Sequence, residues 1–317
     1  MSASTSTPRI AVLDDYQGAA RAFADWTPVE RRAQVDVYAD HLADPDALVE
    51  RLLPYDIVCV MRERTPLPRE IIERLPSLKL ICSTGRRNAS IDADAANERG
   101  IQVVHTSYTS SPTVELTWAL ILAGARHITA ESASLRSGGW QVSVGDDLAG
   151  QCLGIIGLGR VGSQVAKLGL AFGMNVIAWS QNLTAAAADA VGVKWVAKEA
   201  LLREADIVSI HLVLSRRTTG LIGPAELALM KPTARLVNTS RGPIVVEAAL
   251  ISALEAGTIA GAALDVFDTE PLPRDHPYRR IENLLATPHV GYVSRGMYRR
   301  FYGDTVANIL QWLASHG

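Results

Sequence analysis

The sequence predicts an α/β protein made of two doubly wound parallel-sheet domains. Apolar, strand-like runs alternate with helical patterns along almost the whole chain, an order that favours parallel sheets covered by helices on both faces. The chain has 317 residues, which suits two domains of ordinary size. A glycine-rich strand–helix–strand unit in the middle of the chain distinguishes the second predicted domain from the first.

The first hundred residues have the pattern of a complete α/β domain without a glycine motif. Strand-like runs occur at residues 9–15, 33–38, 56–61, 78–83 and 101–105. Helical patterns separate them at residues 18–24, 45–53, 69–75 and 92–99. A helix at 112–126 then leads into the second domain, whose further strands we expect at 207–212, 234–239, 261–266 and 284–287. A last helix at 294–313 carries regularly spaced apolar residues, namely Met297, Phe301, Val306, Ile309 and Leu313.

The glycine-rich unit spans residues 152–180 and predicts dinucleotide binding. An apolar run at 153–156 leads to Gly157, Gly159 and Gly162 in G-x-G-x-x-G spacing, and a second strand follows at 175–179. These glycines permit a tight turn, close approach of a pyrophosphate, and close packing of helix on strand, respectively. The helix beginning near Arg160 and Val161 would direct N–H groups at the phosphates. The alternative, a glycine-rich turn without a ligand, is disfavoured by the complete strand–helix–strand context.

Two details of this unit bear on its ligand and its packing. Ser163 and Gln164 follow Gly162 where a nucleoside-triphosphate P-loop requires lysine and a hydroxyl residue, so that motif is excluded. The segment after the glycines is predicted to be helical, because apolar residues recur there at intervals of three and four, namely Val161, Val165, Leu168 and Phe172.

The end of the second strand bears on the choice of coenzyme. The acidic residue that binds the ribose of NAD is missing there, and the strand is followed by Ser180, Gln181 and Asn182. No arginine is present to bind a 2′-phosphate. Because these three side chains can form hydrogen bonds with either coenzyme, we expect NAD or NADP, with a lean to NADP or dual use.

Composition and charge exclude several other classes. The formal net charge is −2 and no basic block is present, which argues against a nucleic-acid surface. The polar start lacks the apolar core of a signal peptide, and the longest apolar run, 116–125, is too short to cross a membrane. Cys59, Cys82 and Cys152 are far apart and lie in apolar runs, as expected of buried thiols in a reducing compartment. We therefore expect a cytoplasmic protein, and the spacing of potential ligands predicts no metal site.

Three strand ends in the last third of the chain carry residues suited to catalysis. Residues 236–242 end in Arg241, residues 264–271 contain Glu270, and residues 287–292 contain His289. In a doubly wound sheet, ligands bind outside the carboxyl ends of the strands. Reduction of a 2-keto acid needs a hydride, a proton for the carbonyl oxygen and an anchor for the carboxylate. An arginine fork can orient the carboxylate, and a histidine beside a carboxylate can donate the proton.

Each of these three residues has a structural alternative when it is taken alone. Arg241 could form a capping ion pair, Glu270 could be a turn residue, and a lone histidine is more often structural. The three together favour catalysis. We assign Arg241 to substrate orientation, His289 to general acid–base catalysis and Glu270 to the support of His289.

With these motifs in hand, the sequence resembles the D-isomer-specific 2-hydroxyacid dehydrogenase family over nearly its whole length. The family pattern has an NTSRG-like arginine, an ALDVF..EP-like glutamate and a TPH.G-like histidine after a GLGxxG loop. Arg241, Glu270 and His289 fit it with spacings of 29 and 19 residues. The resemblance implies NAD(P)-dependent reduction of a small 2-keto acid, glyoxylate or hydroxypyruvate first, to a D-2-hydroxy acid.

The resemblance also implies an organisation for the chain. Residues 1–106 and 292–317 would form a flavodoxin-like substrate domain, residues 107–291 a Rossmann dinucleotide-binding domain, and a cleft between them would close over the substrate. The dinucleotide-binding domains would form a homodimer. The polar segment 136–150, with Trp140 exposed, is a candidate interaction arm.

Looser matches to the family extend both binding sites. On the coenzyme side these are Thr113, His211, Thr218, Thr239 and Asp265. Asp265 taken alone is as well explained as a strand-end acid bound to a loop backbone. On the substrate side the matches are Arg62, Gly85, Arg86, Arg87 and Asn88. Arg86 and Arg87 depart from the glycine-rich form of this loop. If even one of the three arginines points inward, a substrate with a second acidic group is favoured; the alternative is a solvated loop.

Two other functions stay open at this point. NAD(H)-sensing corepressors of the same family keep the three catalytic residue types, so a binding protein is the main alternative. A dehydrogenase acting on formate or phosphite ranks lowest, because formate enzymes usually have longer chains. The sequence leaves open the identity of the keto acid, the preferred coenzyme and the working direction.

Overall fold

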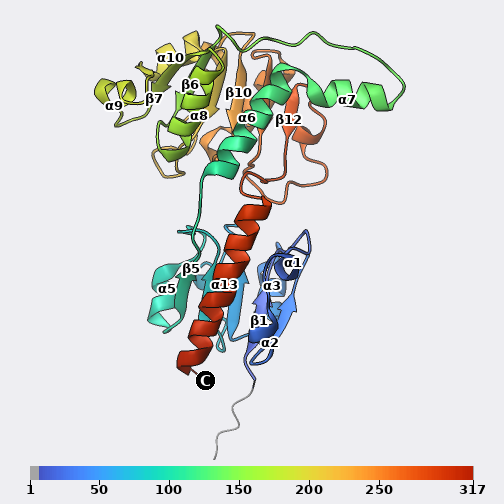
Figure 1. The fold of residues 1–317 in the computed structure, drawn as a ribbon, viewed down its shortest axis with the longest axis vertical. Helices are drawn as coiled ribbons and strands as arrows, with labels where there is room; N and C mark the ends of the chain where they lie inside the picture. Colours follow the sequence, from blue (N-terminus) through green and yellow to red (C-terminus); the bar gives the residue numbers. More distant parts are fainter. Residues whose placement is uncertain (1–6, 317) are drawn as a thin grey trace, which may run out of the picture. The chain divides into compact units, whose positions relative to one another are not determined.

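The computed structural model describes residues 7–316, which form two units, each built on a parallel β-sheet (Figure 1). The described residues up to Thr109 and those from Val293 onward form unit 1, and Ser110–Tyr292 form unit 2. Helices cover both faces of the sheets, which confirms the predicted fold class. The polar N-terminal segment, which was predicted to lack a signal peptide, lies largely in residues 1–6, outside the described range. Within that range, no helix is both long and apolar enough to span a bilayer.

Unit 1 contains a five-stranded sheet in the order β2-β1-β3-β4-β5, with all neighbours parallel. Its strands are β1 (Arg9–Val12), β2 (Gln34–Val37), β3 (Ile57–Val60), β4 (Leu80–Ser83) and β5 (Gln102–His105). Each of the five predicted runs contains one of these strands. The central strands β3 and β4 are buried along their whole length, as continuous apolar runs require.

The helices of unit 1 lie on both faces of this sheet. They are α1 (Ala20–Phe23), α2 (Thr27–Glu30), α3 (Pro45–Leu52), α4 (Arg69–Ile72), α5 (Ala93–Glu98) and α13 (Arg295–His316). Helix α2 was not predicted from the sequence, since its single turn is too short to show a period. The side chains of α3, α4 and α5 share one core. On the other face α13 packs against α1, α2 and β4, and the Tyr302 hydroxyl lies 3.2 Å from the Asp15 carboxylate.

The last helix buries the apolar residues that its sequence pattern predicted. Their exposed fractions are at most 8% in the folded chain, and the residues are Met297, Phe301, Val306, Ile309 and Leu313. Because they recur at helical spacing, they form one stripe along α13.

Unit 2 contains a seven-stranded parallel sheet in the order β12-β11-β10-β9-β6-β7-β8. Its strands are β6 (Cys152–Ile156), β7 (Asn175–Trp179), β8 (Lys194–Trp195), β9 (Ile207–Ile210), β10 (Arg235–Asn238), β11 (Gly261–Leu264) and β12 (Leu284–Ala286). The order reverses between β6 and β9, which makes their carboxyl ends the expected ligand-binding edge. β8 was not predicted, because two residues carry no periodicity.

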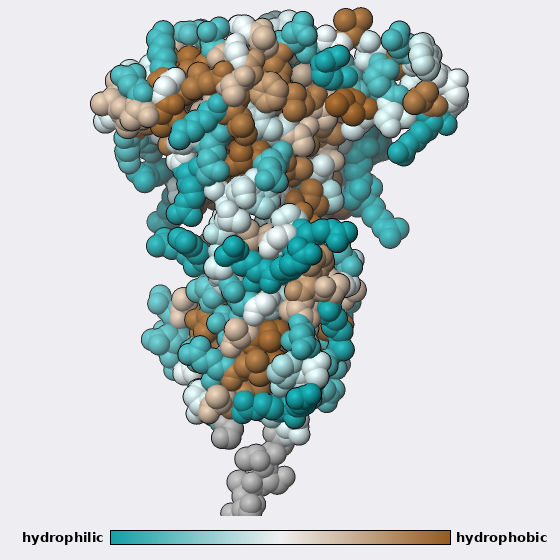
Figure 2. Space-filling model, in the orientation of Figure 1, coloured by the Kyte–Doolittle hydropathy of each residue, from teal (hydrophilic) through white to brown (hydrophobic). Residues whose placement is uncertain are grey.

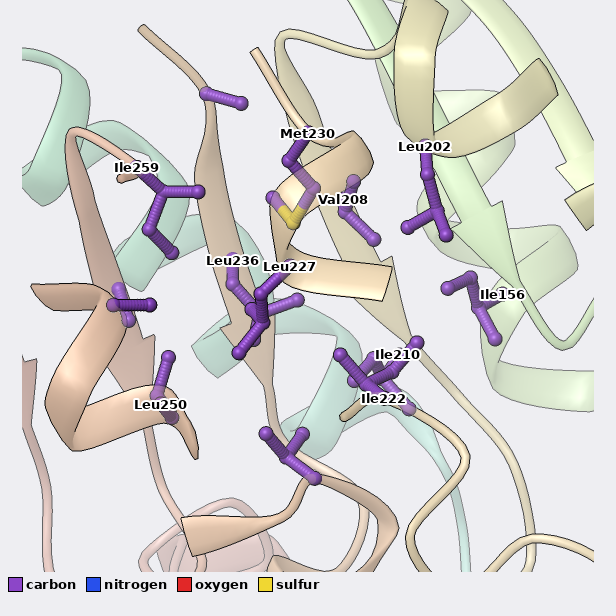
Figure 3. Close-up of a cluster of buried hydrophobic side chains, with 14 of the residues drawn as sticks. Ile156, Leu202, Val208, Ile210, Ile222, Leu227, Met230, Leu236, Leu250 and Ile259 are labelled. Carbon is purple, nitrogen blue, oxygen red and sulfur yellow. The ribbon is translucent and has the colours of Figure 1, made fainter. Parts of the chain in front are cut away.

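Two apolar cores cover the faces of this sheet. The helices of unit 2 are α6 (Ser111–Ala125), α7 (Ile128–Arg136), α8 (Arg160–Ala171), α9 (Ala185–Asp189), α10 (Lys198–Glu204), α11 (Pro224–Leu229) and α12 (Glu247–Glu255). Side chains of α10, α11 and α12 meet one face, where Ile156, Val208 and Leu236 point toward Leu202, Leu227 and Leu250 (Figure 3). Helices α6 and α8 cover the other face.

Helix α8, predicted as a helix, buries a face made mainly of small residues. Gly162, Val165, Ala166 and Gly169 are buried, whereas Leu168 and Phe172 of the apolar pattern are each 41% exposed. Small residues allow the helix axis to lie close to the sheet: a β-carbon at Gly169 would lie 2.7 Å from Leu153 Cδ2. The Phe172 ring instead stacks on Trp118, with centroids 4.7 Å apart.

The cysteines confirm only part of what was expected of them. Cys59 and Cys82 are buried thiols, but Cys152 is half-buried. Cys59 and Cys82, far apart in the sequence, are direct partners in the β3–β4 register. The adjacent Cys59 thiol and burial raise the pKa of Cys82 well above its usual value. The sequence did not predict this pairing, because it depends on the order of the strands in the sheet.

We expect Gly169→Val to destabilise the chain by about 1–3 kcal/mol, because the new side chain must displace Leu153 in a packed interface. Urea unfolding at constant m-value measures the change. Leu168→Ala, on the exposed side of the same helix, is the matched control and should cost less than about 1 kcal/mol. A larger loss for Leu168→Ala than for Gly169→Val would contradict the observed packing of α8.

Candidate active site

The glycine loop at the carboxyl end of β6 is shaped by two close contacts and one open position. Gly157 has a φ of +103°, and a β-carbon there would lie 2.6 Å from the His211 carbonyl oxygen. A β-carbon at Gly162 would overlap the Gly157 carbonyl oxygen. At Gly159, by contrast, no described atom beyond its chain neighbours lies within 4 Å of the β-carbon position. Packing therefore requires the first and third glycines, and the middle one leaves space above the N-terminus of α8.

That space suits a pyrophosphate. The first turn of α8 begins at Arg160 and offers N–H groups that intrahelical bonding leaves without carbonyl partners. The positive end of the helix dipole lies at the same place and favours an anion. Arg160 is exposed and Val161 is half-buried. These residues fit the phosphate-binding part of a dinucleotide.

The three residues after β7 divide into one that supports the loop and two exposed residues. The Ser180 hydroxyl accepts a hydrogen bond from Leu158 N at 2.9 Å, which joins the end of β7 to the glycine loop. Gln181 and Asn182 are exposed. Ser180 is therefore already engaged in holding the loop, while Gln181 and Asn182 are accessible to a ligand.

The loop after β9 lies next to the glycine loop. The Nε2 atom of His211 is 2.9 Å from the Ser209 hydroxyl, and burial lowers the pKa of His211 to about 3, so this ring is neutral. Thr218 closes the loop, since its hydroxyl donates to Val213 O and accepts from Ser215 N, both at 2.8 Å. The observed contacts of His211 and Thr218 are structural and shape the wall of the site.

Arg241 lies just beyond the carboxyl end of β10, in a turn that side chains hold in place. Asn238 donates from Nδ2 to Arg241 O at 2.9 Å and accepts from Ser240 N at 3.0 Å. The Arg241 guanidinium donates to Ser240 O at 2.7 Å. Sequence reasoning missed Asn238, although a buried amide at a strand end is a recognisable turn signal. The turn fixes where the arginine leaves the sheet.

Two threonines predicted near the coenzyme lie beside this strand. The Thr239 hydroxyl is 2.8 Å from that of Thr117, whose own hydroxyl also lies 2.8 Å from Thr113 O. The structure thus brings Thr113 and Thr239 together through Thr117. Thr117 faces the sheet from α6 and had no motif to mark it.

The carboxylate of Asp265 holds the loop after β12. Oδ1 accepts from the Thr287 hydroxyl at 2.6 Å and from Val290 N at 2.8 Å, and Oδ2 accepts from Gly291 N at 2.8 Å. These contacts match the alternative considered for Asp265, a strand-end acid bound to a loop backbone. Burial raises its pKa, while the Thr287 hydroxyl, the Val290 amide, the His289 charge and the Gly291 amide act in the opposite direction.

His289 sits in this loop with a left-handed backbone, φ +51°, which is uncommon outside glycine. Such conformations persist where the surrounding structure fixes them, and they occur often at functional sites. Its Nδ1 atom lies 2.5 Å from Glu270 Oε2. The other oxygen of Glu270 accepts from Phe267 N at 2.9 Å. The structure therefore brings Glu270 and His289 into direct contact, and both side chains remain partly exposed.

A close backbone contact joins this pair to the arginine turn. Gly242, next to Arg241, lies so near Phe267 that a β-carbon would overlap the Phe267 carbonyl group. Arg241, Glu270 and His289 thus belong to three adjacent strand ends, β10, β11 and β12, that are tied together by short contacts. This arrangement can hold an anion beside a histidine whose Nε2 is available for proton transfer.

In unit 1, Arg62 lies against the turn that follows β4. Its backbone is left-handed, with φ +54°, and a β-carbon at Gly85 would overlap its guanidinium group. Nη1 donates to Thr84 O and Arg87 O, each at 3.4 Å. Gly85 is therefore required for Arg62 to lie over this turn. The structure brings Arg62 and Gly85 together.

The remaining predicted substrate residues have different environments. Asn88 is occupied within the turn, donating to Arg62 O at 2.6 Å and accepting from the Ser90 hydroxyl at 2.6 Å. Arg86 and Arg87 are exposed. Asn88 thus shapes the loop, and the three arginines place positive charge along it.

Comparison with known proteins connects this geometry to one family. The family model described as "D-isomer specific 2-hydroxyacid dehydrogenase, NAD binding domain" matches residues 118–291. A glyoxylate reductase from Thermococcus litoralis is 37% identical over 275 residues, covering 83% of this chain and 82% of that protein. A D-3-phosphoglycerate dehydrogenase from Methanocaldococcus jannaschii is 41% identical over 250 residues, covering 78% of this chain. The chain spans 47% of the length of that second relative.

Among solved structures, a phosphoglycerate oxidoreductase from Vibrio cholerae superposes with a TM-score of 0.92 at 34% identity. The match covers 97% of this chain and 99% of that one. Both units therefore have a counterpart in a structure of this kind.

Substitutions at two glycines should separate folding from ligand binding. Gly162→Ala should lower Tm by at least about 2 °C, because its β-carbon overlaps the Gly157 carbonyl oxygen. Gly159→Ala should leave Tm within about 2 °C yet weaken NAD(H) binding at least about tenfold, since its methyl group occupies the open space. Calorimetric melting and titration measure both. Undiminished NAD(H) binding by Gly159→Ala would contradict the placement of the pyrophosphate.

Proposed function

The chain belongs to the D-isomer-specific 2-hydroxyacid dehydrogenase family, and on that premise we propose that it reduces a small 2-keto acid to a D-2-hydroxy acid. Glyoxylate and hydroxypyruvate are the first candidates; the name of the Thermococcus litoralis relative supports the former. The observation that carries the proposal is the contact of His289 Nδ1 with Glu270 Oε2 at 2.5 Å, on the strand-end edge that also holds Arg241.

In this proposal His289 is the general acid of reduction and the general base of oxidation. With Nδ1–H directed to Glu270, the opposite atom, Nε2, exchanges a proton with the substrate oxygen. Glu270 fixes the ring orientation, because its carboxylate is in direct contact with Nδ1. Arg241 holds the substrate carboxylate in its planar fork. NAD(P)H, bound over the glycine loop, would supply the hydride.

We propose that the coenzyme site accepts NADP as well as NAD, with a lean to NADP. The family model supports NAD(H) use. Gln181 and Asn182, exposed after β7, carry no negative charge that would repel a 2′-phosphate. Ser180 contributes through its bond to Leu158 N, which holds the glycine loop in place.

The substrate carboxylate or a second acidic group would be bound in part by unit 1. Arg62 lies over the turn at Gly85, and Arg86 and Arg87 extend from the same turn. The guanidinium group of Arg62, from the loop after β3, lies beside the two arginines of this turn, and positive charge of this kind favours an anionic ligand. We propose that this loop is the substrate loop of the enzyme, and that its charge favours keto acids with an additional anionic or polar group.

We also propose that the protein is a homodimer that uses the segment from α7 to residue 150. Helix α7 extends away from the sheet (Figure 1) and buries none of its described side chains. The segment exposes Leu135, Trp140, Val142 and Val144, the last by 92%. Its shape is fixed, since Glu131 accepts hydrogen bonds from the backbone of Val142 and Ser143. Hydrophobic residues also lie exposed over unit 2 in Figure 2.

An ordered, apolar arm of this kind favours contact with another protein surface.

For the location of the protein, we propose the cytoplasm, supported by the free thiols of Cys59 and Cys82.

Absorbance at the nicotinamide band tests the reaction directly. We expect turnover of glyoxylate or hydroxypyruvate with NADPH, NADH or both, assayed beside pyruvate and bulkier 2-keto acids. A higher kcat/KM for keto acids with a second anionic group would support the role of the arginine loop. Binding of NAD(H) without turnover of any acid would overturn the enzymatic proposal and favour an NAD(H)-sensing protein.

Two substitutions test the proton-transfer pair. His289→Ala should lower kcat at least about 100-fold with little change in coenzyme affinity, because proton transfer of this kind contributes about 10²–10⁴-fold. Glu270→Gln should lower kcat at least about tenfold, because the carboxylate that orients the ring through Nδ1 is lost. Steady-state rates and coenzyme titration measure both effects. An unchanged kcat in Glu270→Gln would place Glu270 outside the mechanism.

The proposed dimer arm can be tested by mass in solution. Trp140→Ser combined with Val144→Asp should shift the chain from dimer to monomer in sedimentation equilibrium, since both side chains are exposed on the arm. Val213→Asp, an equally exposed valine on another loop, is the control and should leave the mass unchanged. A monomeric wild-type chain at micromolar concentration would refute the proposal.

A further inference from the structure

A second acid–histidine pair lies near the first one in unit 2. His276 Nε2 is 3.1 Å from Glu247 Oε1, and the two side chains are 13% and 28% exposed. The Nδ1 atom of His276 accepts from Tyr278 N at 3.2 Å. Because Nδ1 is an acceptor, the ring proton is on Nε2 and points to Glu247. No role in the proposed reaction has been assigned to either residue.

The pair joins two segments that each carry a proposed catalytic residue. Glu247 is the first residue of α12, the helix that follows Arg241 and the short 3-10 turn η1 (Gly242–Ile244). His276 lies in the loop after Glu270, just before the 3-10 turn η2 (Pro277–Arg279). A hydrogen bond between Glu247 and His276 therefore ties the segment after Arg241 to the segment after Glu270.

A continuous set of contacts leads from His276 to the carboxylate of Glu270. The His276 and Tyr278 ring centroids are 4.9 Å apart, and those of Tyr278 and Phe267 are 6.1 Å apart. Phe267 N donates to Glu270 Oε1 at 2.9 Å. The loop itself is closed by Arg279, which donates to Pro273 O at 2.7 Å and Leu272 O at 2.6 Å. Motion at His276 would thus reach Glu270 through packed groups.

A third polar residue, Asp268, lies beside the pair. Burial and the charge of Glu247 raise the pKa of Asp268, and His276 acts in the opposite direction. Glu247 is favoured as an anion at the N-terminus of α12.

From these contacts we infer that Glu247 and His276 are positioning residues, which hold the loop of Glu270 so that its carboxylate stays in contact with His289. This inference rests on the proposed function, because it assumes that Glu270 and His289 act in proton transfer. In this inference the pair acts through Phe267 and Glu270. Loss of the pair should affect the chemical step more than the binding of coenzyme.

The first test compares disruptive and conservative substitutions. Glu247→Leu and His276→Leu should each lower kcat about tenfold, while the Kd for coenzyme changes less than about twofold. Glu247→Gln and His276→Gln keep an acceptor and a donor, respectively, and should retain most of kcat. Wild-type kcat in both leucine variants overturns the inference, and so does an equal loss in the glutamine variants. If a leucine variant fails to fold, the alanine variant of the same residue replaces it in this test and in the cycle below.

The second test is a double-mutant cycle with Glu270→Gln. If Glu247 acts through Glu270, Glu247→Leu should lower kcat about tenfold in the wild-type chain and less than about twofold in the Glu270→Gln background. Equal losses in both backgrounds would mean an independent structural effect and would overturn the inference. His289→Ala tests the proposed function separately. An unchanged kcat in that variant would overturn the proposed function itself, independently of the result of the double-mutant cycle.

Discussion

The short contacts around the Asp265 carboxylate hold the loop on which the proposed chemistry depends. The two oxygens accept hydrogen bonds from the Thr287 hydroxyl and from two backbone N–H groups. These bonds fix the loop in which His289 has a left-handed backbone. Most of the binding capacity of the acid is used in this way. A buried carboxylate at the end of the neighbouring strand therefore sets the position of His289. Glu270, which follows the same strand as Asp265, contacts the His289 ring.

Close backbone packing at three glycines also shapes the site. Gly157, Gly162 and Gly242 each occupy positions where a β-carbon would meet backbone atoms. At Gly157 and Gly242, loops after different strands approach one another more closely than side chains would permit, and at Gly162 helix α8 approaches the loop after its own strand. The parallel sheet aligns the strand ends, and the glycines allow the loops to converge. The loops after β6, β9, β10, β11 and β12 thereby lie along one edge of the sheet.

Much of this could be predicted from the sequence, because strands, glycine spacing and strand-end residues are local signals. Six of the seven strands of unit 2 agree with the alternation in the sequence, and the Glu270–His289 contact agrees with the motif spacing. The packing face of α8 could not be predicted, since apolar spacing pointed to Leu168, whereas close approach selected Gly169. The engagement of Ser180 by Leu158 N also depends on tertiary contact. Contacts between side chains of different strands produce no periodic pattern in the sequence.

The register of β3 and β4 has a practical consequence for following how the chain opens. Cys59 and Cys82 lie side by side within the sheet of unit 1, and Cys152 begins the sheet of unit 2. A thiol reagent reaches buried sulfur atoms only when the surrounding structure opens. The labelling rate at Cys59 and Cys82 would therefore report opening of the five-stranded sheet, whereas half-buried Cys152 is not protected in the same way. The two native thiols thus provide unit 1 with a chemical reporter of its own opening.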